Sequence, residues 1–292
     1  MDDWANIRAD LERRSGEPVL AFEPASGGSG GIKGIVRTTN DQYFLKAVPL
    51  SSPWLADCRV EASVTSPHSP RLRWTAEYAG HLVLAFDVAP GREPTEPWPE
   101  ADLRRVLATT DRLEATATGV LPTVVDRMRG RCSTWWVLAE YGVRDRLSVG
   151  QLSAWERLNL RRLAQVEGEW ERLVAGDQLL HFDLRHDNLR LGDDGRVWVL
   201  DWGRSCRGPG WVDAVCLLLE SSIGALDAEV LFRQTARGAA ADQAAVDAFL
   251  VALASYWRHA GSRPADEASA WIRPRQVRSG RATVEWLQRR WG

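Results

Sequence analysis

The segment LLHFDLRHDNLRL at residues 179–191 constrains the fold of this chain more than any other stretch. It places six titratable or amide side chains within eight positions, between two apolar runs. Charged groups are costly to bury unless they are paired or bind a ligand. The segment is therefore expected to form a loop whose polar side chains gather at one site.

A hairpin is predicted directly after this loop. The sequence NLRLGDDGRVWVL places two short strand-like runs on either side of a turn at residues 192–195. The hairpin would bring Asn188 and Asp201 to neighbouring strand ends, although they are thirteen residues apart. Asp183, Asn188 and Asp201 could then converge on one point. Three oxygen ligands of this kind suit a hard cation such as Mg²⁺, which keeps waters and shares itself with substrate phosphates.

Length and charge limit the class of protein. The chain has 292 residues, of which 45% are hydrophobic, and a formal net charge of −2. This allows a sizeable core in one large domain or in two lobes. A nucleic acid partner is not expected, because binding to a phosphate backbone needs an excess of basic residues.

Cysteine usage and hydropathy indicate the compartment. The four cysteines lie far apart and form no C-x-x-C pair, which favours a reduced cytoplasmic protein over a disulfide scaffold or a zinc site. The acidic start MDDWANIRADLERR lacks a long apolar run, so no signal peptide is expected. No window has the length of an uncharged membrane span. We therefore predict a cytoplasmic protein with no membrane partner; the sequence does not indicate its oligomeric state.

Predicted strands gather early in the chain and predicted helices later. Strands are expected at 18–23, 31–37 and 42–48, with two more within 71–88, and helices at 2–14 and 53–66. After a proline-rich segment at 89–100, helices are expected at 99–116, 151–175, 209–221, 226–237, 241–259 and 281–290. The pattern predicts an α+β protein in which a small sheet-rich lobe precedes a larger helical one.

Lysine is rare in this sequence. Only Lys33 and Lys46 occur among 37 basic residues, so the other 35 are arginines. A coding bias towards arginine explains the excess. A lysine that persists against such a bias is a candidate for a role that needs a compact point charge, which arginine cannot copy.

Two motifs together identify a resemblance. HFDLRHDN followed by VLDWG resembles the H-x-D-x-x-x-x-N and D-x-G signatures of the protein-kinase-like superfamily. More closely, the chain is similar to the aminoglycoside phosphotransferase family, the small-molecule kinases of that superfamily. The similarity extends over most of the chain and is strongest from residue 179 to 216.

The resemblance implies a role for each motif residue. Asp183 would be the catalytic base, and Asn188 and Asp201 would hold Mg²⁺. Lys46 would bind the α- and β-phosphates of ATP or GTP, and Glu61 would pair with it. The flexible loop over the phosphates would consist of Ser26, Gly27, Gly28, Ser29 and Gly30. The hinge backbone that meets the nucleotide base would consist of Ala85, Phe86 and Asp87.

Two further residues are implied to support the catalytic loop. His181 would organise the loop without acting as the base, and Asp213 would brace it by hydrogen bonds. The sequence departs from the family pattern at Phe182, where many relatives have glycine. The phosphate loop SGGSGGIKG also departs from G-x-G-x-x-G.

The resemblance also implies a protein-kinase-like two-lobe fold. Residues 1–88 would form the N-lobe, with a small antiparallel sheet, one main helix and the nucleotide site. Residues 89–98 would form the hinge, and residues 99–292 a helical C-lobe with the catalytic loop, the metal site and the acceptor site. Asp201 and Asp213 are only twelve residues apart, which leaves no room for the long activation segment of a protein kinase. A small-molecule hydroxyl is therefore the expected phosphate acceptor.

The identity of the acceptor is left open. By resemblance it would be an antibiotic such as an aminoglycoside, whose phosphorylation gives resistance. The segment from residue 251 onward carries eight arginines against three acids, and this excess of positive charge disfavours a polycation. A nucleoside or macrolide antibiotic fits it better, unless the arginines simply face solvent or Glu93, Glu96, Glu100 and Asp102 bind the cation. A metabolic kinase for a sugar, choline-like or amino alcohol is the alternative, and a non-catalytic pseudokinase is a third hypothesis.

Overall fold

The computed structural model describes residues 3–25, 31–221, 224, 226–265, 270 and 272–292. The chain folds into two compact units. Unit 1 consists of Met1–Pro94, Leu113–Leu121 and Asp187–Ser205, and unit 2 of Thr95–Arg112, Pro122–His186 and Cys206–Gly292. The functional division into residues 1–88, 89–98 and 99–292 stays a prediction, and it differs from the compact units because two later segments fold against unit 1.

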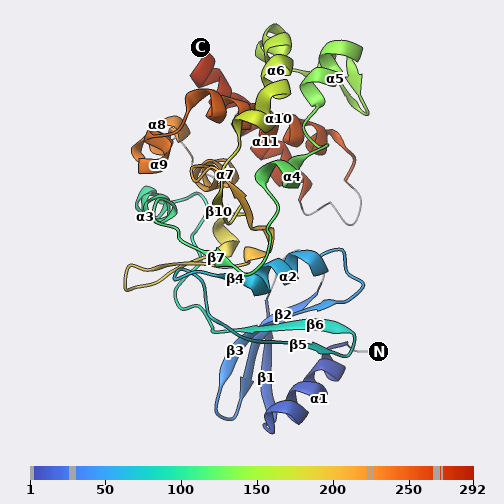
Figure 1. Ribbon diagram of the computed structural model, residues 1–292, viewed down its shortest axis with the longest axis vertical. Helices are drawn as coiled ribbons and strands as arrows, with labels where there is room; N and C mark the ends of the chain where they lie inside the picture. The colour runs from blue at the N-terminus through green and yellow to red at the C-terminus, as the bar shows by residue number, and fades with distance from the viewer. Residues whose placement is uncertain (1–2, 26–30, 222–223, 225, 266–269, 271) are drawn as a thin grey trace. The chain divides into compact units, whose positions relative to one another are not determined.

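Unit 1 is built on a five-stranded antiparallel sheet (Figure 1). In spatial order its strands are β1 (Val19–Pro24), β2 (Ile32–Thr38), β3 (Gln42–Pro49), β6 (His81–Phe86) and β5 (Leu72–Tyr78). The three strands and the strand pair expected from alternating apolar residues are therefore confirmed. Each neighbouring pair is antiparallel. Short turns require this for β1–β2, β2–β3 and β5–β6, whereas β3 and β6 are joined through α2, β4 and β5.

The two faces of the sheet pack against different helices. Successive side chains of a strand point to opposite faces, so Leu45 and Ala47 of β3 join the core that includes Ile7 and Leu11 of α1 (Asp3–Ser15). Val48 instead packs with Cys58 of α2 (Leu55–Ser63). Alternation therefore places Lys46, between Ala47 and Leu45, on the face that α2 covers.

A later hairpin of the chain also belongs to unit 1. Strands β11 (Leu189–Leu191) and β12 (Val197–Val199) pair antiparallel, as the sequence predicted. Leu191 exchanges both backbone hydrogen bonds with Arg92 at 2.7 and 3.1 Å, and the amide of Val199 donates to the carbonyl of His68 at 2.8 Å. The short pair β4 (Val64–Thr65) and β7 (Thr116–Ala117) completes the unit. The backbone contacts thus fix the hairpin to the N-terminal part of unit 1.

Unit 2 is mostly helical. Its helices are α3 (Glu100–Thr110), α4 (Val124–Met128), α5 (Thr134–Tyr141), α6 (Ala154–Leu173), α7 (Val212–Glu220), α8 (Ala228–Gln234), α9 (Ala236–Ala239), α10 (Gln243–Ser262) and α11 (Arg273–Trp291). Two short strand pairs accompany them, β8 (Val143–Arg144) with β9 (Leu147–Ser148) and β10 (Gln178–Leu180) with β13 (Cys206–Gly208).

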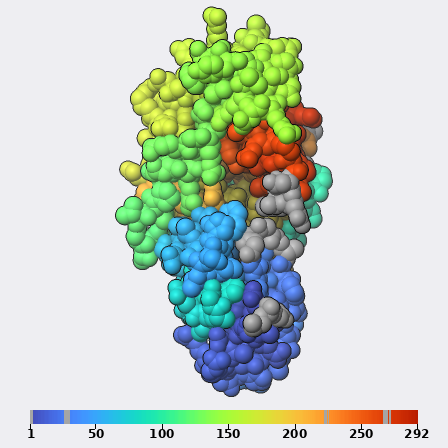
Figure 2. Space-filling model, turned by 90° about the vertical axis from the view of Figure 1, so that its right-hand side faces the viewer, coloured from blue at the N-terminus to red at the C-terminus, as the bar shows by residue number. Residues whose placement is uncertain are grey.

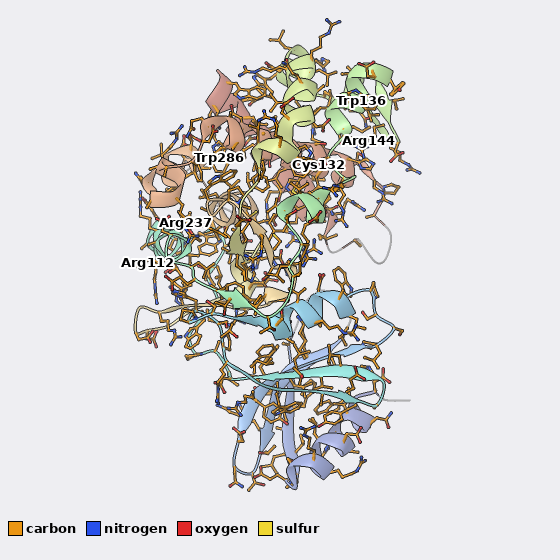
Figure 3. The ribbon with its side chains drawn as sticks, in the orientation of Figure 1. Arg112, Cys132, Trp136, Arg144, Arg237 and Trp286 are labelled. Carbon is orange, nitrogen blue, oxygen red and sulfur yellow. The ribbon has the colours of Figure 1, made fainter. Side chains whose placement is uncertain are left out.

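Helix α10 forms the centre of unit 2. It is apolar on nearly all faces from Ala245 to Ser255, as expected for a helix surrounded by others. Helices α5, α6 and α11 contact it, and in Figure 2 the green and yellow-green side chains of α5 and α6 lie next to the red C-terminal helices. Trp286 of α11 lies among the helices of unit 2 (Figure 3) and is fully buried, and its indole N–H donates to Glu229 at 2.7 Å. Trp286 is thus a core residue.

The helices of unit 2 differ from the predicted ranges in four places. The helix predicted at 99–116 ends at Thr110, and Thr116 belongs to strand β7. Helices α4 and α5 were not predicted, because short helices have little apolar periodicity. Helix α11 starts at Arg273, eight residues before the predicted start, with a proline in its first turn. The helix expected at 226–237 is divided at Thr235, whose hydroxyl accepts a hydrogen bond from the amide of Gly238 and starts a new helix.

In the part of the chain that the structure describes, no helix is both long and apolar enough to cross a membrane.

Candidate active site

Lys46 is the centre of a cluster of buried charges in unit 1. Its Nζ lies 2.7 Å from Oε2 of Glu61 and 2.8 Å from Oδ1 of Asp201. Lys46 is 8% exposed and Glu61 6%. The cluster joins strand β3, helix α2 and the end of the second hairpin, and it brings together three residues that the sequence had singled out.

The charges of the cluster depend on one another. Burial on its own lowers the pKa of Lys46, but the carboxylates of Glu61 and Asp201 outweigh it and raise that pKa above its usual value. Burial raises the pKa of Glu61 to about 6, and the Lys46 ammonium only partly opposes this. Lys46 therefore stays charged at all physiological pH values, whereas Glu61 takes up a proton in mildly acidic solution.

The turn that carries Asp201 is held against helix α2. Asp201 has a left-handed backbone (φ 60°) and precedes the 3-10 turn η3 (Trp202–Arg204). A Cβ on Gly203 would lie 3.0 Å from the carbonyl oxygen of Asp57, so glycine allows the turn to approach α2 closely. Arg204 also pairs with Asp57 at 3.3 Å. The D-x-G glycine therefore fixes the position of Asp201 relative to the helix that carries Glu61.

Asn188 and Asp201 lie at the two outer ends of the β11–β12 hairpin. Asn188 directly precedes β11, and the amide of Leu200 donates to its carbonyl oxygen at 2.8 Å. The Asp201 side chain is 34% exposed while one of its oxygens contacts Lys46. An amide oxygen and a partly exposed carboxylate are suitable ligands for Mg²⁺. The predicted placement of these two residues at neighbouring strand ends is confirmed, and the residues fit such an ion; their role in holding it stays a prediction.

The remaining predicted residues form a second group, in unit 2. The buried carboxylate of Asp213 accepts hydrogen bonds from the backbone amides of His181 at 2.9 Å and Phe182 at 2.8 Å. Burial raises the pKa of Asp213, opposed by His181 and these amides. The amide of Asp183 donates to Nδ1 of His181 at 3.2 Å, so a neutral ring carries its proton on Nε2. Asp213 and His181 therefore hold the backbone on either side of Phe182.

Phe182 has a positive φ of 63°. Residues other than glycine lose about 1–2 kcal/mol in this conformation, because Cβ approaches the following carbonyl. This is the position where the sequence departs from the glycine of many relatives. Glycine would adopt this φ without strain, whereas in this chain the hydrogen bonds from the amides of His181 and Phe182 to Asp213 hold the conformation.

Charged side chains surround Asp183 within unit 2. Arg185 Nη1 lies 3.8 Å from its carboxylate. Burial raises the pKa of Glu220 at the end of α7, Arg275 of α11 opposes this, and Asp183 adds to it. Arg275 Nε lies 3.2 Å from Glu220. Glu220 was not predicted, because it comes near Asp183 only through the tertiary contact of α7 with the loop of Asp183.

Two parts of the predicted nucleotide site remain untested. Residues Ser26, Gly27, Gly28, Ser29 and Gly30 lie outside the described residues. Ala85 and Phe86 end strand β6, where Ala85 pairs with Leu45 and Trp74. The amide of Asp87 donates to the carbonyl of Arg71 at 2.9 Å, and its carboxylate pairs with Arg71 and Arg73. The contact of this segment with a nucleotide base stays a prediction.

Half of the eight C-terminal arginines have acidic partners within unit 2. Four of the eight form ion pairs: Arg258 with Glu156, Arg275 with Glu220, Arg289 with Asp227, and Arg290 with Glu229 and Asp247. The acids between 93 and 100 are paired as well: Glu93 with Arg190, Glu96 with His186, and Glu100 with Arg104. The excess of arginine counted along the C-terminal segment therefore overstates its positive charge in the folded protein, because acids from other segments pair with part of it.

The fold and the two residue groups define a class of protein. An antiparallel sheet with a buried lysine–glutamate pair, and a helical part with an H-x-D loop, are features of kinase-like phosphotransferases. The sequence of residues 35–249 matches the model of the phosphotransferase enzyme family. The chain belongs to this family and is a small-molecule kinase; no curated protein matches it in sequence.

Solved structures share its fold. One is a thermostable mutant of an aminoglycoside phosphotransferase in complex with ADP and hygromycin B, with 14% identity, a TM-score of 0.60 and coverage of 95% of this chain and 98% of that one. The choline kinase LicA from Streptococcus pneumoniae has 15% identity, a TM-score of 0.55 and coverage of 97% and 99%. A spectinomycin phosphotransferase bound to ADP and spectinomycin has 9% identity, a TM-score of 0.57 and coverage of 99% and 94%. At these identities the likeness establishes the protein-kinase-like fold.

Proposed function

We propose that this enzyme transfers the γ-phosphate of ATP or GTP, bound with Mg²⁺, to a hydroxyl group of a small molecule. The observation that carries the proposal is the buried contact of Lys46 with both Glu61 and Asp201. Buried ion pairs add little net stability. Stability of the fold therefore does not explain a lysine held between two carboxylates, one of which is a candidate metal ligand. The contact is what a site for a metal-bound polyphosphate requires.

Each residue has a role in the proposed reaction. Lys46, oriented by Glu61, binds the α- and β-phosphates. Asn188 and Asp201 would hold Mg²⁺, which would supply positive charge to the phosphates. The Asp183 carboxylate accepts the proton of the acceptor hydroxyl while the oxygen of that hydroxyl bonds to the γ-phosphorus. The bond from that phosphorus to the bridging oxygen breaks, and the nucleoside diphosphate leaves.

The proton-accepting role suits Asp183 better than His181. His181 is fully buried, and its Nδ1 already accepts the amide hydrogen of Asp183. The Asp183 side chain is 27% exposed, so a hydroxyl can approach it. His181 and Asp213 then act on the reaction by fixing the backbone from which Asp183 projects.

The balance of charges near Asp183 indicates how much positive charge the acceptor carries. Asp183 and Glu220 are balanced by Arg185 and Arg275. A site for a polycationic aminoglycoside would be expected to carry an acidic excess. The balance favours an acceptor with few charges, such as a nucleoside or macrolide antibiotic, and phosphorylation of such a compound would give resistance.

A metabolic acceptor is the second candidate. The fold is shared with the choline kinase LicA and with a choline/ethanolamine kinase family protein from Mesorhizobium loti, which has 16% identity, a TM-score of 0.60 and coverage of 97% and 95%. A sugar, choline-like or amino alcohol is then the substrate. Increased drug tolerance in a sensitive host that expresses this chain would favour the antibiotic over the metabolite.

A phosphorylation screen read by mass spectrometry tests the proposal. It combines the enzyme and Mg²⁺ with ATP or GTP and a panel of aminoglycosides, macrolides, nucleoside antibiotics, sugars and amino alcohols. We expect one class to gain a phosphate with the wild type. The Asp183→Ala and Asp201→Ala variants should lose turnover to a similar degree, about 10²- to 10⁴-fold. Normal turnover in either variant would contradict the role assigned to that residue.

A further inference from the structure

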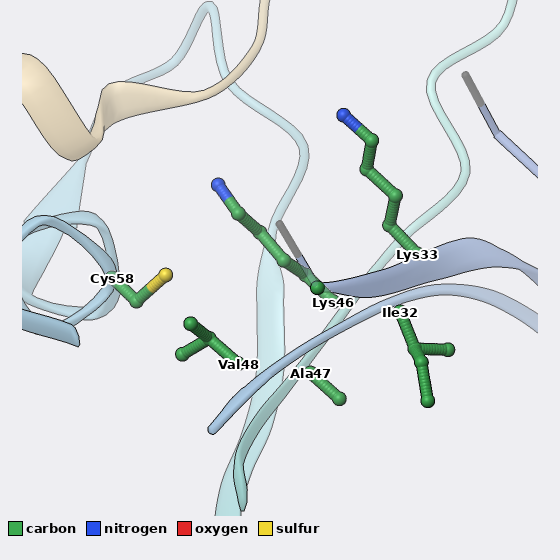
Figure 4. A pocket seen from close by; sticks show the side chains of 7 residues that line it. Ile32, Lys33, Lys46, Ala47, Val48 and Cys58 are labelled. Atoms are coloured by element: carbon green, nitrogen blue, oxygen red, sulfur yellow. The ribbon is translucent and has the colours of Figure 1, made fainter. Parts of the chain in front are cut away.

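The only two lysines of the chain face each other in the sheet. Lys33 of β2 is the direct register partner of Lys46 of β3. Directly opposite residues of an antiparallel pair share one face, and Figure 4 shows both side chains extending to the same side of the sheet, away from Ile32 and Ala47. Both lysines line one small pocket with Gly31, Ile32, Ala47, Val48 and Cys58.

Two like charges in directly opposite positions destabilise a strand pair. The same strand shows the favourable alternative, because the exposed Arg37 of β2 pairs with Glu23 of β1 at 2.8 Å. The register therefore gathers two cations on one face of the sheet, close to Glu61. An anion bound between the two lysines would offset their like-charge contact.

Chain geometry fixes Lys33 next to the expected phosphate loop. It lies three residues after Gly30, the last residue assigned to that loop. A Cβ on Gly31 would lie 2.4 Å from the carbonyl oxygen of Ala47, so only glycine lets the start of β2 approach β3 this closely. This close approach holds Lys33 beside Lys46.

The balance of charge in unit 1 leaves room for an anion. Burial raises the pKa of Glu61, and Lys33 is close enough to join Lys46 in opposing it. Lys33 and Lys46 together match the two carboxylates of Glu61 and Asp201. A bound Mg²⁺ would leave two positive charges in excess, which the phosphates of a nucleotide can neutralise. Ammonium groups bind phosphate as compact point charges, where the wider arginine fork needs more room.

We propose that Lys33 is a second phosphate-binding lysine, which with Lys46 forms a two-lysine cradle for the polyphosphate of the nucleotide. The inference rests on the proposed nucleotide-dependent function and adds to it a residue to which the family resemblance assigned no role. It also accounts for the presence of lysine at these two positions in a chain that otherwise uses arginine.

Binding measurements on the full chain test the cradle. Isothermal titration with Mg²⁺ would compare the wild type with Lys33→Met, using adenosine, AMP, ADP and a non-hydrolysable ATP analogue, or the guanosine series if the enzyme prefers it. We expect nucleoside affinity to stay within about twofold and affinity for the di- and triphosphate to fall about ten- to a hundredfold. The Lys33→Arg variant should recover part of this loss. The Arg37→Met variant removes an exposed cation from the same strand and should bind every ligand like the wild type.

The outcomes separate the inference from the function on which it rests. A wild type that binds no nucleotide overturns both. A wild type that binds nucleotide, with a Lys33→Met variant that binds the triphosphate equally well, overturns the cradle alone. Equal weakening for the nucleoside and the triphosphate also overturns it, because the substitution then acts on the fold or on the base site. Thermal melting of each variant identifies a loss of fold.

Discussion

The two groups of functional residues are held in place by different kinds of contact. In unit 1, Lys46, Glu61 and Asp201 contact one another through charged side-chain atoms. In unit 2, the Asp213 side chain instead holds backbone amides, those of His181 and Phe182. The first group positions a charge, and the second positions a stretch of chain from which a side chain projects.

This difference predicts how each group responds to change. An ionic cluster depends on the protonation and charge of every member, so substitutions should act in graded steps. A backbone held by one buried carboxylate has no substitute acceptor for its amides, so loss of that carboxylate should act all at once. Changes in side-chain charge, pH and backbone conformation can therefore tell the two groups apart.

The largest effect is expected for Asp213→Ala. The variant leaves the amides of His181 and Phe182 without their acceptor, and each buried unsatisfied amide costs about 1–3 kcal/mol. With the loop released, turnover should fall about as far as in Asp183→Ala, roughly 10²- to 10⁴-fold. Urea unfolding and steady-state kinetics measure the two effects.

Asp227→Ala is the matched control for Asp213→Ala. Asp227 also accepts two backbone amides, those of Glu229 and Val230, but as the partly exposed N-cap of α8. Its loss should cost about 1 kcal/mol of stability and leave turnover unchanged. A turnover within threefold of the wild type in Asp213→Ala would show that Asp213 does not position the catalytic loop.

A smaller effect is expected for Glu61→Gln. Lys46 keeps its contact with Asp201 at 2.8 Å, so the ammonium is misdirected without being left alone. We expect a loss of about 2 kcal/mol in transition-state stabilisation, or about thirtyfold in kcat/KM. Glu23→Gln, which removes an exposed carboxylate from the same sheet, should have no effect on the kinetics. Equal kinetics for the two variants would remove Glu61 from the site.

Acidification should affect the ionic cluster by about a factor of ten. The pKa of Glu61 is raised to about 6, so lowering the pH from 7 to 5 protonates most of it, and kcat/KM should fall about tenfold towards the value of Glu61→Gln. The Glu61→Gln variant should lack this part of the pH profile. A wild-type profile that matches the variant's would place the relevant titration elsewhere.

The free energy of unfolding should increase when Glu61 takes up its proton, although kcat/KM falls. The folded pKa of Glu61 lies above its ordinary value of 4.5, so the folded state binds the proton first. The contribution of this group to the free energy of unfolding is greatest below pH 4.5 and is lost as the pH rises through about 6. Unfolding free energies of wild type and Glu61→Gln at pH 5 and pH 7 isolate this contribution.

The smallest effects are expected at Phe182, in the backbone-held group. Glycine adopts its positive φ without strain, so Phe182→Gly should change the free energy of unfolding by less than about 1 kcal/mol, as the relieved strain offsets lost packing and chain entropy. A β-branched valine tolerates this conformation poorly and should cost about 2 kcal/mol more than glycine. A valine variant as stable as the glycine variant would show that the backbone is not constrained there.

Local sequence patterns predicted one part of the site well. One turn brings Asn188 and Asp201 to neighbouring strand ends, a relation that spans few residues and could be inferred without knowledge of the packing. The contact of Lys46 with Glu61 instead joins a strand to a helix, and only the family resemblance implied it.

Relations that depend on packing between distant helices could not be inferred. Glu220 comes near Asp183 because α7 holds the loop of Asp183 through Asp213. Two arginines of the C-terminal segment have partners on α6, α8 and α10. A count of charges along the sequence could not show which arginines form ion pairs. Lys33 is an intermediate case. The rarity of lysine in the sequence made it a candidate functional residue, but only the register of β2 against β3 showed that it lies opposite Lys46.

Because lysine is so rare, cleavage by a lysine-specific protease can measure local opening of the sheet in unit 1. A protease that cleaves only after lysine has two cleavage sites in this chain, after residues 33 and 46, both within paired strands of one sheet. Cleavage requires those strands to separate, so its rate under native conditions reports the opening of that sheet alone. Digestion with and without nucleotide would then measure, on an unlabelled and unmodified protein, how strongly the ligand closes the strands that we expect to bind it.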